Sequence, residues 1–274
     1  MTDRPEDRAL RTAIEAAQRA GDELLRRWAM PISGRASKSS TTDEVSDADH
    51  ASERIVVDAI RRAHPDDEIV SEEGGGVSGR SAHRWLVDPL DGTINYLYRI
   101  PQWCVSIACV DADGPLAGVV HDPVKRELFF ATRGGGAWLR AGTPDSATAQ
   151  DRQLAVTELT DLRLALVADG FSYSAEERRE QARREAAMLP LIRDVRRTGS
   201  AALDLAYVAA ARVDAYCEAG GNPWDWAAGR LLVSEAGGRL SEAPGVRPDG
   251  PTLIASGTGI HDALVALVHR VQRA

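Results

Sequence analysis

An apolar run that ends in two closely spaced carboxylates is the feature that most constrains the fold of this chain. Residues 85–87 predict a buried strand, and Asp88 and Asp91 follow in a sharp turn with Gly92, which can adopt φ values that other residues avoid. Carboxylates held this close repel each other unless a cation lies between them, and hard oxygen ligands favour magnesium or manganese. The backbone N–H groups of Gly92 and Thr93 can hold a phosphate oxygen. The turn therefore predicts a site where metal and phosphate meet.

Two further segments place an acid beside an apolar element. Residues 69–71 predict a short strand that ends at Glu72, and this carboxylate lies beside Asp88 if the two strands are neighbours. Asp225 falls in the first turn of a helix predicted over 225–236, where the helix dipole stabilises an anion. Taken alone, Asp225 is more simply a helix-capping acid. Taken with the other two segments, it indicates a shared acidic site.

The chain resembles the inositol monophosphatase family of magnesium-dependent, lithium-sensitive sugar-phosphate phosphatases. The matching motifs follow one another over most of the chain: Lys38 to Asp49, Ser71-Glu72-Glu73, Asp88-Pro-Leu-Asp91-Gly-Thr93-Ile-Asn95-Tyr96, Gly199-Ser-Ala-Ala202, Trp224-Asp225-Trp-Ala-Ala-Gly229 and Glu235-Ala-Gly-Gly238. Leu90 replaces the more usual isoleucine, and Ser71 replaces a common glycine. Neither departure changes a predicted ligand side chain. The resemblance implies a layered αβαβα sugar-phosphatase fold and a homodimer.

The resemblance also implies a role for each matching residue. Two or three Mg²⁺ ions, with Mn²⁺ as an alternative, would be bound by Glu72, Asp88, the backbone carbonyl of Leu90, Asp91 and Asp225. Asp49 and Thr93 would orient the attacking water, and Glu72 would be a third catalytic residue. The phosphate would contact the amides of Gly92 and Thr93, and the alcohol would face Gly199, Ser200, Ala201 and Glu218. Asp49 is equally an ordinary capping acid by its position, and Lys38 matches a family lysine near the metal site or is a solvated surface residue.

The implied reaction is phosphomonoester hydrolysis, with a metal-activated water attacking in line on phosphorus and no covalent intermediate. Glu218 matches the family position that contacts inositol hydroxyls, which favours inositol 1-phosphate or a related polyol or sugar phosphate. The same metal core also serves fructose 1,6-bisphosphate, histidinol phosphate or 3′-phosphoadenosine 5′-phosphate. A regulatory binding protein that retains the fold is an alternative from another class, although such a protein has no chemical need for an intact ligand set.

Periodicity and turn signals predict an α/β chain that forms a single unit over 1–274. It divides into an α+β lobe with an antiparallel sheet, approximately 1–145, and an α/β lobe, approximately 154–274. The first lobe is predicted to contain helices at 5–29 and 48–63, a hairpin at 105–120 and a strand at 127–131. The second is predicted to contain strands near 164–168, 213–217 and 253–255 and helices at 174–189, 200–211, 225–236 and 260–272. Residues 141–153 predict an exposed connection, and four arginines predict a solvated face of the helix at 174–189: Arg178, Arg179, Arg183 and Arg184.

The composition excludes other classes of protein. With 43% hydrophobic and 27% charged residues the chain can form a sizeable core. A net charge of −8 argues against a nucleic-acid partner held by phosphate neutralisation. No apolar run reaches the ~20 residues of a membrane span, and the N-terminus lacks the apolar core of a signal peptide. Three cysteines in apolar segments predict buried thiols, so we expect a cytoplasmic protein without disulfides: Cys104, Cys109 and Cys217.

Overall fold

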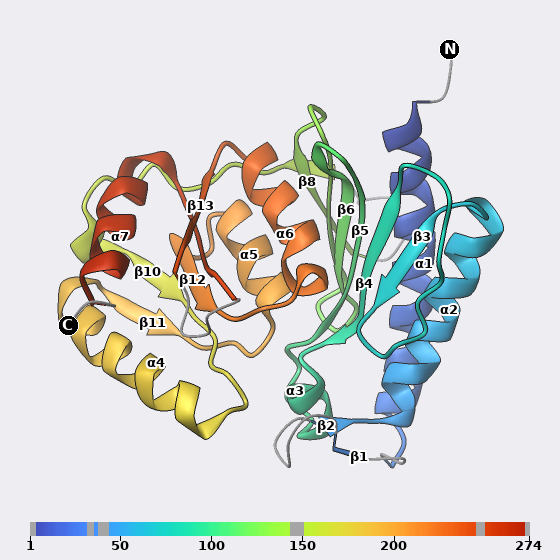
Figure 1. Ribbon diagram of the computed structural model, residues 1–274, viewed down its shortest axis with the longest axis horizontal. Helices are drawn as coiled ribbons and strands as arrows, with labels where there is room; N and C mark the ends of the chain where they lie inside the picture. The colour runs from blue at the N-terminus through green and yellow to red at the C-terminus, as the bar shows by residue number, and fades with distance from the viewer. Residues whose placement is uncertain (1–3, 32–35, 38–43, 143–150, 245–249, 272–274) are drawn as a thin grey trace.

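The structure is a computed structural model in which the chain forms five alternating layers of helices and sheets (Figure 1). It describes residues 4–31, 36–37, 44–142, 151–244 and 250–271. The outer helices on one side are α1 (Pro5–Trp28) and α2 (Asp47–Ala63), the central helices are α5 (Ala201–Ala209) and α6 (Pro223–Glu235), and the outer helices on the other side are α4 (Ala175–Met188) and α7 (Thr258–Val271). A sheet separates each helical layer from the next, which confirms the predicted αβαβα fold.

The first sheet has the strand order β3-β4-β5-β6-β7-β8-β9. Its strands are β3 (Glu68–Ser71), β4 (Arg84–Asp91), β5 (Cys104–Asp111), β6 (Gly114–Asp122), β7 (Glu127–Thr132), β8 (Ala137–Ala141) and β9 (Asp151–Gln153). Only the β3–β4 pair is parallel among the described strands of this sheet, and the remaining neighbours pair antiparallel as predicted for this lobe.

The second sheet has the order β11-β10-β12-β14-β13. Its strands are β10 (Leu166–Ala168), β11 (Asp194–Arg196), β12 (Ala215–Ala219), β13 (Arg239–Ala243) and β14 (Thr252–Ser256). Strand β10 pairs parallel with β11 and β12, whereas β14 pairs antiparallel with β12 and β13. Shorter elements complete the described chain: β1 (Ala36–Ser37), β2 (Glu44–Val45), α3 (Thr93–Leu97) and the 3-10 turns at Leu162–Leu164 and Leu189–Leu191.

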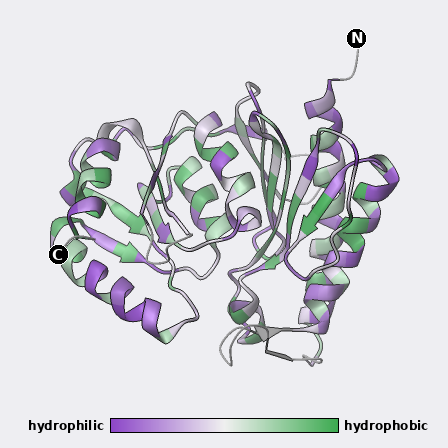
Figure 2. Cartoon of the chain, in the orientation of Figure 1, coloured by the Kyte–Doolittle hydropathy of each residue, from purple (hydrophilic) through white to green (hydrophobic). Residues whose placement is uncertain are grey.

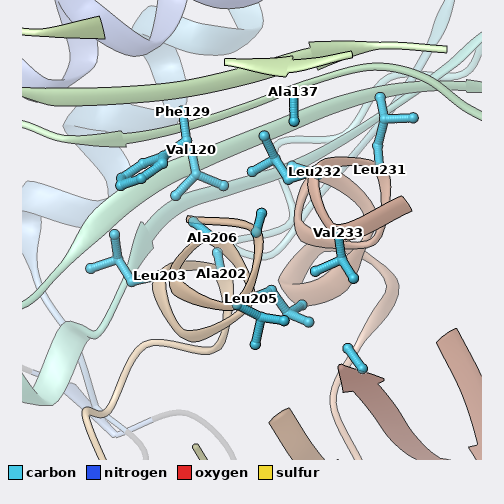
Figure 3. Packing of buried hydrophobic residues seen from close by; sticks show 14 of the residues in the cluster. Val120, Phe129, Ala137, Ala202, Leu203, Leu205, Ala206, Leu231, Leu232 and Val233 are labelled. Atoms are coloured by element: carbon cyan, nitrogen blue, oxygen red, sulfur yellow. The ribbon is translucent and has the colours of Figure 1, made fainter. Parts of the chain in front are cut away.

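The apolar core between the two sheets forms around α5 and α6 (Figure 3). Leu203 and Leu232 from these helices are fully buried, and Val120 and Phe129 from the first sheet pack on the same cluster. Burial of each such side chain stabilises the fold by about 1.5–3 kcal/mol. Outside this core, α4 is predominantly hydrophilic (Figure 2). The central position of α5 and α6 brings the N-terminal ends of both helices to the acidic turn of the first sheet.

Several predicted elements are confirmed, and three differences have a physical reason. Strand β4 continues through the acidic turn to Asp91, because a register shift between Asp88 and Asp91 lets the ladder with β5 continue past the extra residues. Residues 151–153 of the predicted exposed connection at 141–153 are exposed as predicted, but they extend the sheet as the edge strand β9. Strands β8, β11 and β13 were not predicted, because their sequences lack a clear apolar alternation. These strands form because they pair with neighbouring strands of the sheet.

The cysteine prediction is confirmed, since all three cysteines are buried free thiols. Among the described helices, none combines the length and the apolar character that crossing a membrane requires. Lys38 lies outside the described residues, and the division of the chain into two lobes stays a prediction.

Candidate active site

The parallel pairing of β3 with β4 brings two carboxylates together. Ser71 is the partner of Val87 in the ladder, and the backbone N–H of Glu72 donates to the carbonyl oxygen of Val87 at 3.1 Å. The next residue on each strand is therefore an acid, Glu72 on one and Asp88 on the other. Burial raises the pKa of Asp88 well above its ordinary value, and the negative charges of Glu72 and other acids nearby raise it further. The predicted proximity of these two carboxylates is confirmed.

The turn after β4 requires a glycine. Gly92 has φ of 96°, in the left-handed region, and a Cβ atom there would lie 2.9 Å from the carbonyl oxygen of Gln102. Helix α3 starts at the next residue, Thr93, whose hydroxyl lies 3.0 Å from both Asp49 Oδ1 and the carbonyl oxygen of Leu90. Because a hydroxyl donates only one hydrogen, its lone pairs stay available to orient another donor.

Asp49 both caps a helix and contacts the acidic turn. Its Oδ2 accepts hydrogen bonds from the backbone N–H of Ser46 at 2.9 Å and from the Ser46 hydroxyl at 2.6 Å, which completes a capping box at the start of α2. Its Oδ1 accepts the hydrogen bond from Thr93. Both interpretations of Asp49 from the sequence are therefore compatible, because one carboxylate oxygen serves each contact.

Asp91 joins the first sheet to the start of α5. Its Oδ2 accepts hydrogen bonds from the Ser200 hydroxyl and from the backbone N–H of Ala202, both at 2.7 Å. Burial raises the pKa of Asp91 to about 6, although these two hydrogen bonds lower it. The helix start at residues 199–201 therefore lies directly beside the acidic turn.

Asp225 reaches the same place from α6. Pro223 begins this helix, and Asp225 accepts a hydrogen bond from the backbone N–H of Asn222 at 2.6 Å. Burial raises its pKa well above the ordinary value, and the charge of Asp91 adds to the effect. Asp225 thus caps its helix and also belongs to the acidic group, so the two interpretations of this residue combine.

One pocket collects most of the predicted site residues. Its lining includes Glu72, Asp88, Leu90, Asp91, Gly92, Thr93, Gly199, Ser200, Ala201, Glu218 and Asp225. Of the predicted site residues, Asp49 does not line this pocket and contacts it through Thr93 instead. Within the described ranges, no three acidic, histidine or cysteine side chains already converge tightly enough to coordinate an ion. The ligand roles therefore stay predictions, supported by the hard oxygen donors and the raised pKa values of this group.

The pocket also contains residues that the sequence reasoning missed. These are Asp169, Gly170, Phe171, Tyr173, Arg197 and Asp204. Asp169-Gly170 directly follows strand β10, which is the same pattern of an apolar strand followed by an acid and a glycine that identified the turn after β4. That repetition is the sequence signal that points to this side of the pocket.

The predicted solvated face of α4 is wrong at Arg184. This side chain is 4% exposed and forms an ion pair with Asp169, which is fully buried. Burial raises the pKa of Asp169, and the positive charge of Arg184 opposes that rise. Arg184 turns inward because α4 packs on the second sheet through this side, where a lone arginine can be buried only beside an acid. The neighbouring Arg183 is exposed, as predicted.

This chain is similar to known proteins over nearly its whole length. The sequence profile of the inositol monophosphatase family matches residues 6–273. Nus factor SuhB of Xylella fastidiosa is 40% identical to this chain over 269 residues, which cover 95% of this chain and 94% of that protein. Inositol-1-monophosphatase of Mycobacterium bovis is 42% identical over 239 residues, which cover 85% of this chain and 80% of that protein.

Solved structures share the fold. Extragenic suppressor protein suhB from Bartonella henselae matches with a TM-score of 0.83 and 33% identity, covering 95% of this chain and 98% of that one. SuhB of Mycobacterium tuberculosis matches with a TM-score of 0.81 and 35% identity, covering 98% of each chain. A family profile matched over nearly the whole length, together with relatives at 40% identity, shows that this chain belongs to the inositol monophosphatase family.

Proposed function

We propose that this chain is a magnesium-dependent phosphomonoesterase that hydrolyses inositol 1-phosphate or a related polyol phosphate. The observation that carries the proposal is the acidic group of one pocket, in which Asp88, Asp91 and Asp225 all have raised pKa values. Like charges buried together favour a bound cation, and carboxylate and carbonyl oxygens suit Mg²⁺. Glu72 and the carbonyl of Leu90 would complete the ligand set.

When bound, magnesium supplies charge neutralisation at the phosphate and makes a coordinated water more acidic. The chain's own residues would do the rest. Thr93 Oγ1 donates to Asp49 Oδ1, so its lone pairs can accept a hydrogen from the attacking water and aim the water at phosphorus. The amides of Gly92 and Thr93 would hold the phosphate, and Glu218 would accept hydrogen bonds from the alcohol. Magnesium-dependent phosphate release from inositol 1-phosphate tests this proposal.

A panel of four substrates separates inositol 1-phosphate from the other members of its class. It adds fructose 1,6-bisphosphate, histidinol phosphate and 3′-phosphoadenosine 5′-phosphate, each with magnesium and with a chelator. The highest kcat/KM with inositol 1-phosphate supports the proposed substrate, because the metal core is common to all four and only the alcohol side can discriminate. Preference for another member would replace the substrate and retain the chemistry.

Magnesium should stabilise the protein more at pH 8 than at pH 5. Burial raises the pKa of Asp91 from 3.8 to about 6, so the folded state binds more protons than the unfolded state between these values, and the unfolding free energy falls as pH rises through them. The loss from this group is on the order of 3 kcal/mol. Bound magnesium neutralises the deprotonated group and offsets the loss. Thermal melting with magnesium or with a chelator at both pH values checks this, and equal shifts would contradict it.

Replacing Glu218 by glutamine should reduce selectivity for polyol phosphates. The substitution keeps the shape and removes the charge, and a hydrogen bond to a charged acceptor contributes about 1.5–3 kcal/mol. We expect KM for inositol 1-phosphate to rise about tenfold or more, with little change for 4-nitrophenyl phosphate, which has no alcohol hydroxyls. Glu158→Gln, at an exposed acid, is the control. Unchanged selectivity in Glu218→Gln would remove this residue from the alcohol site.

The relatives named Nus factor favour a second candidate, a regulatory binding role on the same fold. This role and hydrolysis are separable, because Asp91→Asn should remove only the chemistry. Rescue of a deletion phenotype by this variant would support a binding role, and rescue by the wild-type chain alone would support hydrolysis. A homodimer, a cytoplasmic location and a role for Lys38 belong to the same proposal, and sedimentation at several concentrations tests the dimer.

A further inference from the structure

A chain of hydrogen bonds lies behind the carboxylate that faces the alcohol. Tyr216 precedes Glu218 by two residues on β12, so both side chains leave the same face of the strand. The Tyr216 hydroxyl donates to Glu218 Oε2 at 2.8 Å. Trp226, in the first turn of α6, donates from its indole Nε1 to the Tyr216 hydroxyl at 3.0 Å. Tyr216 is fully buried and Trp226 is 5% exposed, so solvent does not compete for these bonds.

The chemistry of the three groups fixes the direction of both hydrogen bonds. An indole N–H only donates and an ionised carboxylate only accepts. The phenol between them accepts one hydrogen bond and donates the other. The hydroxyl of Tyr216 therefore points its hydrogen at Glu218. A hydrogen bond to a charged acceptor is stronger than one between neutral groups, and the bond from Trp226 polarises the phenol further. Removing either donor weakens the hold on Glu218.

Gly170 also lies against the carboxylate of Glu218, and both residues line the pocket. A Cβ atom at this position would lie 2.1 Å from the carboxylate carbon of Glu218, so any larger residue at 170 would force the carboxylate out of its present position. Contact with Gly170 on one side and the bond to Tyr216 at Oε2 restrict the orientation of the group. Glu218 lines the pocket, and because its Oε2 already accepts the bond from Tyr216, we infer that Oε1 accepts the bond from a substrate hydroxyl.

The same turn of α6 also serves the metal side of the pocket. Asp225, a proposed metal ligand, directly precedes Trp226. One turn of α6 therefore positions Asp225 on the phosphate side of the pocket. It also positions Trp226, the next residue, which supports Glu218 on the alcohol side. A change in the position of α6 would move both together.

We propose that Tyr216 and Trp226 are positioning residues that set the preference for polyol phosphates by holding Glu218 in its substrate-facing orientation. This inference rests on the proposed phosphatase function. It assigns no chemistry to either residue, since both act through Glu218. Tyr216 acts directly on the carboxylate, and Trp226 acts on it through Tyr216.

Tyr216→Phe and Trp226→Phe test the proposal with inositol 1-phosphate and 4-nitrophenyl phosphate as the two substrates. Both variants remove a donor and keep an aromatic ring in the core. For Tyr216→Phe we expect KM for inositol 1-phosphate to rise about tenfold, from the loss of one charge-assisted bond, with kcat and the reaction of 4-nitrophenyl phosphate nearly unchanged. For Trp226→Phe the same shift should be smaller, about threefold, because the bond lost is one step away.

Trp224→Phe is the matched control. Trp224 lies in the same turn of α6, and its buried indole Nε1 has no hydrogen-bond partner among the described residues. This variant should leave unchanged the substrate ratio, which is kcat/KM for inositol 1-phosphate divided by kcat/KM for 4-nitrophenyl phosphate. In a Glu218→Ala background, Tyr216→Phe should have no further effect on that ratio, because its target is absent.

The outcomes are separable. An active wild-type protein whose substrate ratio is unchanged in Tyr216→Phe would overturn the inference, and so would an equal loss on both substrates, which indicates a structural role only. A ratio shift of the same size in the Glu218→Ala background would also overturn it. Failure of the wild-type protein to release phosphate from either substrate would instead overturn the proposed function and, with it, the inference. Melting temperatures confirm that each variant is folded.

Discussion

Magnesium-dependent phosphate release is expected to fall by more than about 100-fold when Asp91 is replaced by asparagine. Loss of a group that merely supports a metal ligand lowers metal affinity or activity by about 10- to 100-fold. Loss of a ligand itself should lower activity further. Asparagine keeps an oxygen that can accept the hydrogen bonds from Ser200 and Ala202, so the start of α5 should stay in place. Phosphate release across a magnesium titration measures the effect.

The stability of this variant gives a second readout. Burial raises the pKa of Asp91 from 3.8 to about 6, so the magnesium-free protein loses stability between these pH values and the loss is complete above about pH 6. The neutral amide should raise the melting temperature at pH 8 without magnesium while it removes activity. Asp113→Asn, at an exposed acid in the β5–β6 hairpin, is the control for loss of one charge. Retained activity in Asp91→Asn would contradict the proposed ligand role.

Replacing Arg184 by methionine is expected to cost about 3–5 kcal/mol of unfolding free energy. This substitution keeps most of the volume of the side chain and leaves the carboxylate of Asp169 buried without its cation, and breaking a buried ion pair on one side has this magnitude. Urea denaturation monitored by fluorescence measures the difference in unfolding free energy between the variant and the wild-type protein. Arg183→Met is the matched control, because that arginine is exposed and should change stability by less than about 0.5 kcal/mol.

A double variant separates the ion pair from the packing around it. Asp169→Asn with Arg184→Met removes both charges, and we expect it to recover much of the stability lost in the single variant. A single variant as stable as Arg183→Met would show that the pair contributes no more than a surface contact. Because Asp169 lines the pocket, the double variant also shows whether this pair affects substrate preference.

Most of the fold was predictable because its main elements have strong local signals. Helices α1 and α2 follow an apolar periodicity, α6 is marked by a proline start and an apolar run, and the β5–β6 hairpin has a turn of acids and glycine. Strands β11 and β13 carry too little apolar alternation to be recognised, since their stability comes from their neighbours in the sheet. Strand pairing of this kind depends on distant residues.

The acidic part of the site was also predictable from local sequence signals, whereas the alcohol side of the pocket was less predictable. Glu72, Asp88 and Asp91 each come directly after or close behind an apolar run that the sequence marks clearly, and the structure brings them to one pocket. Arg184 shows where the reasoning failed. Its helix is rich in charged residues, and only the packing of α4 on the second sheet decides which arginine is buried.

The contact between Asp91 and the start of α5 has a consequence for how the protein is made. The two partners are separated by about a hundred residues, and Asp225 lies further still along the chain. A growing polypeptide therefore has the acidic turn long before it has the groups that complete the pocket. With Asp225 in the proposed ligand set, hydrolysis would begin only after α6 has left the ribosome and docked, so an unfinished chain would release no phosphate.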